Sequence, residues 1–114
     1  MSELTEALGV FGARVNADPR LRQMNQTWNR TIDLIPDDSQ ETAHLVYQGG
    51  QMQVERGPSA GADIVLMAPE QTLKEIFLGQ SSPTEPYLAG TLRIKGSQED
   101  MMRLDVLSLL IWGS

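Results

Sequence analysis

The chain has 114 residues, of which 40% are hydrophobic and 21% charged, and a formal net charge of −6. This length supports one hydrophobic core and the composition is that of a globular protein, so we predict a single domain over residues 1–114. The nine Lys and Arg residues are scattered, which argues against a nucleic-acid partner, because phosphate binding needs clustered cations. Cysteine is absent, which excludes disulfides, thiolate metal sites and cysteine nucleophiles.

The first third of the chain changes from helical to strand periodicity. Apolar residues recur at helical spacing from residue 4 to residue 15, which predicts an amphipathic helix over residues 2–16. Asp18-Pro19 is typical of the start of a second, short helix. From Trp28 onward the apolar residues alternate, which predicts a half-buried strand that ends at residues 36–39 (PDDS).

Residues 43–54 carry the clearest local signal. Apolar residues alternate on both sides of Gly49-Gly50, and these glycines supply the positive φ angles that a tight hairpin turn requires. Residues 62–68 (ADIVLMA) are typical of a strand that is covered on both faces. Residues 69–78 then predict a helix with Pro69 at its first position and Gly79 at its C-terminal end.

The last third is expected to contain a loop, a strand and a helix. The loop spans residues 80–89, which include two prolines, and the strand spans residues 91–95 (TLRIK). Residues 97–100 (SQED) fit a capping box that begins the final helix. Runs of strands with helices set apart indicate an α+β fold with a mainly antiparallel sheet.

Candidate catalytic and metal-binding residues are few. His44 is the only histidine, so neither a multi-imidazole metal site nor a hydrolase triad is indicated. The acidic pairs Asp37-Asp38 and Glu99-Asp100 stand where turns and helix starts favour acids, and Asp33 belongs to the polar face of a strand. No Gly-rich phosphate loop or dinucleotide-binding unit is present. We therefore expect no enzyme activity, no metal and no cofactor.

The C-terminal segment LDVLSLLIWGS is more apolar than packing on one sheet face requires. Between residues 101 and 112 only Arg103, Asp105 and Ser108 are polar, and apolar residues point in nearly every other direction of a helical wheel. The apolar run is well short of the roughly 20 residues that span a bilayer. Three roles fit this helix: core packing, an interface with another chain, or the wall of an apolar ligand pocket.

Residues 62–104 also show an ordered pattern. Ala62-Asp63 opens an aliphatic strand, a short helix ends at Gly79, a proline-bearing loop follows, and Gly96 closes the next strand before the last helix. This order resembles that of the sterol carrier protein 2 (SCP2) family. Upstream, the strand that starts near Trp28 and the Gly49-Gly50 hairpin resemble the opening meander of that family. The resemblance covers about residues 20–112.

The resemblance implies a five-stranded, mainly antiparallel sheet covered by helices, with a hydrophobic tunnel between the sheet and the C-terminal helix. It further implies non-catalytic binding or transfer of a lipid or other hydrophobic ligand, such as a fatty acyl chain, a sterol or an isoprenoid. The ending WGS is not a peroxisomal signal, so we expect a cytoplasmic protein of bacterial type, without stable membrane insertion. The residues expected to line the tunnel are Ile76, Phe77, Tyr87, Leu88, Met102, Val106, Leu109, Leu110 and Trp112.

An alternative function belongs to another class. The apolar C-terminal helix would then be a protein-interaction or dimerisation surface, and the chain would serve a larger lipid-related enzyme system. The sequence leaves both functions open, with a homodimer through this helix as one form of the second.

Overall fold

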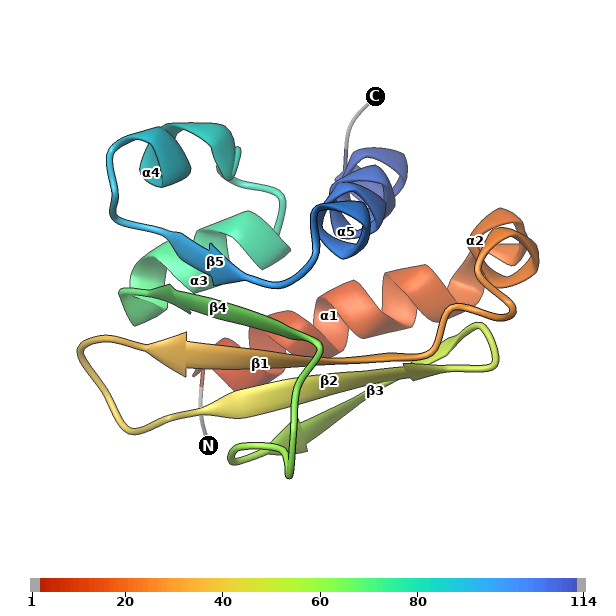
Figure 1. Ribbon diagram of the computed structural model, residues 1–114, viewed down its shortest axis with the longest axis horizontal. Coiled ribbons are helices and arrows are strands. Elements are labelled where there is room, and N and C mark those ends of the chain that lie inside the picture. Colours follow the sequence, from red (N-terminus) through yellow and green to blue (C-terminus); the bar gives the residue numbers. More distant parts are fainter. Residues whose placement is uncertain (1–2, 113–114) are drawn as a thin grey trace.

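The alternating and helical patterns of the sequence form five strands and five helices in the described part of the chain (Figure 1). The computed structural model describes the backbone of residues 3–112 and the side chains of residues 3–106. In chain order the elements are α1 (Glu3–Ala17), α2 (Pro19–Met24), β1 (Arg30–Pro36), β2 (Ala43–Gln48), β3 (Gln51–Arg56), β4 (Ile64–Ala68), α3 (Glu70–Phe77), α4 (Thr84–Leu88), β5 (Arg93–Lys95) and α5 (Gln98–Trp112).

The strands form one sheet in the order β3-β2-β1-β4-β5. Gly49 and Gly50, with φ angles of 61° and 80°, fold β3 back on β2, so that β1, β2 and β3 make an antiparallel meander. β4 pairs in parallel with β1, and β5 pairs antiparallel with β4. The predicted α+β class with a five-stranded, mainly antiparallel sheet is therefore confirmed.

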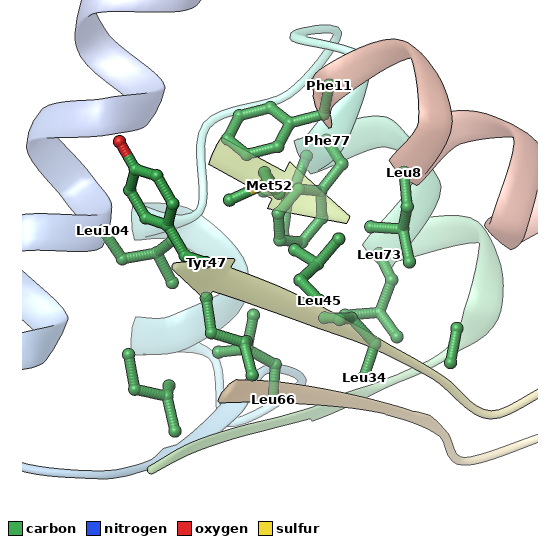
Figure 2. Packing of buried hydrophobic residues seen from close by; sticks show 14 of the residues in the cluster. Leu8, Phe11, Leu34, Leu45, Tyr47, Met52, Leu66, Leu73, Phe77 and Leu104 are labelled. Atoms are coloured by element: carbon green, nitrogen blue, oxygen red, sulfur yellow. The ribbon is translucent and has the colours of Figure 1, made fainter. Parts of the chain in front are cut away.

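The helices all lie on the same side of the sheet (Figure 1). Alternate residues of the strands point toward them and are fully buried, as Ile32, Leu34 and Leu45 show. The core between the two layers also contains Phe11 of α1 and Phe77 of α3, whose rings meet edge to face with their centroids 5.0 Å apart (Figure 2). This contact holds α1 and α3 together above the sheet.

The opposite face of the sheet is crossed by the connection from β3 to β4. The backbone N–H of Ser59 donates a hydrogen bond to Asp33 Oδ1 on β1, over 3.1 Å. Val65 and Met67 of β4 point to this face and are only half-buried, because the helices cover the other face. The prediction that residues 62–68 form a strand covered on both faces is therefore wrong for this side.

Candidate functional site

A cavity of about 320 Å³ lies between the sheet and helices α3, α4 and α5. Its floor consists of apolar side chains that are at least nine-tenths buried: Leu66, Leu73, Ile76, Phe77, Leu92 and Leu104. Its rim carries exposed side chains, with Tyr87 52%, Met102 63% and Leu88 79% exposed. Because these rim residues reach solvent, a ligand could enter the cavity from this side.

α3 provides the central part of the floor. Leu73, Ile76 and Phe77 follow the spacing i, i+3, i+4 and therefore share one face of the helix. The edge-to-face contact with Phe11 fixes the ring of Phe77. The Lys74 ammonium lies 3.2 Å from the Glu3 carboxylate of α1, so that α3 is also tied to α1 through its polar side.

α4 forms one wall of the cavity, in a segment where the sequence predicted a loop over residues 80–89. Pro83 precedes this helix and Pro86 lies in its first turn, where a backbone N–H would have no partner within the helix. Two prolines are therefore compatible with a short helix, and the prediction of a loop is wrong for residues 84–88. The Pro86 carbonyl accepts hydrogen bonds from the N–H groups of Thr91 and Leu92, both over 2.9 Å, which returns the chain to β5.

α5 forms the opposite wall and presents two different sides. Gln98, Met101, Met102 and Asp105 line the cavity at the spacing i, i+3, i+4, i+7, which is one stripe of a helix. Leu104 of the same helix belongs to the buried core and also lines the cavity (Figure 2). Asp100 and Arg103 do not line the cavity, and their contacts with other elements hold the helix in place.

Asp100 anchors the first turn of α5. Its carboxylate accepts a hydrogen bond from Trp28 Nε1 over 3.0 Å, and both of its oxygens lie 3.0 Å from Arg30 Nε. Burial alone would raise the pKa of Asp100, but the hydrogen bonds from Trp28 and Arg30 outweigh it and hold the pKa below its usual value. The sequence explained this residue by the helix start alone. Ser97 Oγ does accept from the Asp100 N–H over 3.1 Å, but the carboxylate makes tertiary contacts.

Arg103 extends this anchor by one turn. It donates a hydrogen bond to Asn25 Oδ1 over 2.7 Å. Its guanidinium carbon and that of Arg30 each lie 5.8 Å from the ring centroid of Trp28, within cation–π range. Trp28 in turn meets the ring of Tyr47 edge to face at 5.6 Å. The polar side of α5 therefore packs on this aromatic pair, and the stripe that contains Met101 and Met102 is left facing the cavity.

Nine residues were expected from the sequence to line an apolar site. Five of them lie around the cavity: Ile76, Phe77, Tyr87, Leu88 and Met102. Val106 is 41% exposed and does not line the cavity. The side chains of Leu109, Leu110 and Trp112 lie outside the described residues.

Several residues around the cavity were not among those expected. Leu73 could have been found because it precedes Ile76 by three positions, and Ile94 because it alternates with the polar residues of β5. Leu66 and Leu92 carry no sequence signal that separates a cavity floor from ordinary core. Met101 belongs to the stripe of α5 that also contains Met102.

His44 lies on the face of the sheet that is remote from the cavity. Its Nδ1 is 2.8 Å from the Gly57 carbonyl oxygen, and its Nε2 is 2.9 Å from a carboxylate oxygen of Glu55. Both ring nitrogens of His44 therefore have hydrogen-bond partners. Within the described residues, no cluster of three or more His, Asp or Glu side chains has the arrangement of a metal site. None of the helices over residues 3–112 has both the length and the apolar character needed to cross a membrane.

The order of elements and the cavity between sheet and helices can be compared with known proteins. The model of the SCP-2 sterol transfer family matches residues 11–108, from the middle of α1 into α5. The chain belongs to this family. In the described part of the chain, the SCP-2 match includes all five strands and the residues that line the cavity. A comparison with curated proteins gave no significant match.

Solved structures with the same fold include other SCP-2 proteins and a part of an enzyme. UbiJ-SCP2, a ubiquinone synthesis protein, is 16% identical with a TM-score of 0.74, and the match covers 94% of each chain. Palmitated SCP2L2 from Aedes aegypti is 16% identical with a TM-score of 0.68 and 95% coverage of each chain. The sec-alkylsulfatase Pisa1 from Pseudomonas sp. is 16% identical with a TM-score of 0.69, over 92% of this chain. The chain spans only 15–16% of the length of the alkylsulfatase.

Proposed function

We propose that the protein binds a lipid or other hydrophobic small molecule in the cavity between the sheet and α5, and that it holds or transfers this molecule without chemical turnover. The observation that carries the proposal is an open cavity whose floor is entirely apolar and whose wall is a stripe of a helix anchored from its other side. The volume lies at the lower end of the ~300–1,000 Å³ that is typical of small-molecule sites. Membership in the SCP-2 sterol transfer family supports the same function.

The energetics of such a site require no salt bridge. Burial of one methylene group contributes about 0.8 kcal/mol, so a chain of about twelve carbons offers on the order of 10 kcal/mol before losses. Association and ordering subtract at least about 4 kcal/mol. The remainder is at most about 6 kcal/mol, which corresponds to a Kd of roughly tens of micromolar or weaker, so apolar walls alone are sufficient for measurable binding.

The first test is to measure whether the purified protein holds an apolar ligand. We expect Nile red, an uncharged dye, to increase its fluorescence in the presence of the protein, and organic extraction of the protein to release lipid detectable by mass spectrometry. A folded protein that does neither would contradict the proposed function.

A matched pair of substitutions tests whether the ligand binds in the cavity. Met102 lies on the rim, whereas Met24, which is 51% exposed at the end of α2, does not line the cavity. Met102→Glu should weaken Nile red binding about five- to tenfold, because it replaces apolar contact area with a charge. Met24→Glu introduces the same charge and should leave dye binding unchanged. Equal effects of the two substitutions would place the dye elsewhere.

A second candidate function is favoured by the exposed apolar side of α5. Met102 and Val106 reach solvent on this helix, and Val106 does not line the cavity. If the helix is an interaction or dimerisation surface, Val106→Glu should reduce the solution mass from dimer to monomer while dye binding stays intact. Light scattering and the Nile red assay on the same sample therefore separate the two functions.

A further inference from the structure

The polar groups around the cavity are all at its rim. Among the side chains that the structure describes, those with polar groups that line it are Thr84, Tyr87, Gln98 and Asp105, and all four are exposed. The polar end of an amphiphile with its chain in the apolar floor would therefore lie beside these residues. They offer a carboxylate, an amide and two hydroxyls. The amide and the hydroxyls both donate and accept hydrogen bonds, whereas the Asp105 carboxylate, the one charged group among them, only accepts.

No cation lines the cavity. All nine Lys and Arg residues of the chain fall within the described side chains, and none of them is a lining residue. Residues 107–114 contain no Lys or Arg, so the undescribed side chains add none. An anionic head group would thus meet no counter-charge at this site.

The basic side chains of α3 and β5 either form ion pairs outside the cavity or point away from it. Lys74 of α3 pairs with Glu3, and Arg93 of β5 pairs with Asp37. Lys95 neighbours Ile94, which faces the cavity, so Lys95 points to the other side of the strand.

On α5 the basic side chain is equally unavailable. Arg103 is held by Asn25 on the side of the helix away from the cavity. The first turn of α5, which carries the positive end of the helix dipole, already contains Glu99 and Asp100, and Ser97 caps the N–H of Asp100. The helix start is therefore occupied by acids of the protein itself.

From this arrangement we infer that the cavity selects amphiphiles whose polar end is a hydrogen-bond donor without negative charge, a long-chain alcohol or amine, over carboxylates and phosphate esters. The inference rests on the proposed function, because it concerns the head group of a ligand in the same cavity. An ionised carboxylate at the rim would face Asp105 without a compensating cation, whereas a hydroxyl or ammonium group would donate to it.

The test uses three ligands with the same apolar chain: dodecanol, dodecylamine and dodecanoate. Each displaces Nile red from the wild-type protein below its aggregation concentration, at pH 8 and about 0.15 M salt, where long-range effects of the net charge are screened. We expect dodecanol and dodecylamine to displace the dye at concentrations at least about tenfold lower than dodecanoate, equivalent to about 1.4 kcal/mol.

Two charge substitutions test the role of Asp105. Asp105→Lys should tighten dodecanoate and weaken dodecylamine, so that the preference between them is reversed. Glu41→Lys makes the same change in net charge in the exposed loop before β2, outside the cavity lining, and should keep the wild-type order. Both substituted residues are exposed, so both variants are expected to fold, which circular dichroism verifies.

The outcomes separate this inference from the proposed function. Displacement by dodecanoate at concentrations equal to or below those of dodecanol would overturn the head-group selection while leaving lipid binding in place. An unchanged order in Asp105→Lys, or the same reversal in Glu41→Lys, would also overturn it. A folded protein that binds neither dye nor any of the three ligands would overturn the proposed function and this inference together.

Discussion

At the scale of single residues, Asp100 connects parts of the chain that are far apart in sequence. Its carboxylate contacts Trp28 and Arg30, 72 and 70 positions away, and is only 6% exposed. Charged hydrogen bonds of this kind contribute more than neutral ones, and loss of one partner leaves the others buried and unpaired. The position of α5, and with it one wall of the cavity, depends on this carboxylate.

The folded state should therefore lose stability at acidic pH in a way that depends on Asp100. Its pKa is lower in the folded protein than the value of about 3.9 in an unfolded chain, so its contribution is present above about pH 4 and is lost as the pH falls through the folded pKa. Asp100→Asn should lower the free energy of unfolding by about 1–3 kcal/mol at pH 7, and this difference from the wild type should shrink as the pH falls below about 4. Urea denaturation of the wild type and of Asp100→Asn at a series of pH values measures the two free energies of unfolding.

The neighbouring acid provides the control for this substitution. Glu99 is exposed in the same turn of α5, so Glu99→Gln should change the free energy of unfolding by no more than about 0.5 kcal/mol. If Asp100→Asn and the wild type lose stability in parallel between pH 5 and pH 3, the carboxylate does not anchor the helix.

At the scale of elements, the sequence predicted those features that depend on interactions between neighbouring residues. The Gly49-Gly50 hairpin, the stripe of α3 and the Asp18 cap of α2 all depend on neighbouring residues, and the structure contains each of them. The parallel pairing of β4 with β1 was not predicted, because it depends on where the crossover from β3 runs. α4 was missed because two prolines in a loop have the same sequence signature as one proline before a short helix and one in its first turn.

The hairpin between β2 and β3 supplies a prediction at this scale. A Cβ atom on Gly50 would lie 2.8 Å from Arg22 Cγ and 2.9 Å from the Arg22 carbonyl oxygen of α2, whereas one on Gly49 would meet nothing within 4 Å. Both glycines have positive φ, so each substitution by Ala carries a backbone penalty of about 1–2 kcal/mol. Gly50→Ala should lower the free energy of unfolding further, because α2 must also move. Thermal unfolding measures both variants. Equal losses of stability in Gly49→Ala and Gly50→Ala would contradict the prediction, because they would mean that α2 moves without any energetic cost.

At the scale of the whole molecule, the cavity depends on how several strands and helices pack together. The residues that line it lie between positions 66 and 105, on β4, α3, α4, β5 and α5 and on the segments that connect them. Periodicity identifies the apolar side of each element but does not show whether those sides meet or leave a space between them. Only the family resemblance predicted a hollow, and the expected residues beyond Val106 lie outside the described side chains.

A hollow interior predicts an unusual response to a larger side chain. Ile94 lines the cavity from β5, so in Ile94→Phe the added ring can occupy empty space instead of displacing packed neighbours. We expect the free energy of unfolding without ligand to stay the same or rise, because the ring gains apolar contacts, while Nile red binding falls at least about tenfold. Overpacking of a filled core would instead lower stability by about 1–3 kcal/mol.

The control makes the same substitution on the other face of the sheet. Ile35 of β1 is half-buried and does not line the cavity, so Ile35→Phe should leave dye binding at the wild-type level. A saturating ligand should raise the melting temperature of the wild type and of Ile35→Phe, because it binds only the folded state, and should have little effect on Ile94→Phe. Destabilisation of Ile94→Phe with unchanged dye binding would mean that the space beside β5 is already filled and that the ligand binds elsewhere.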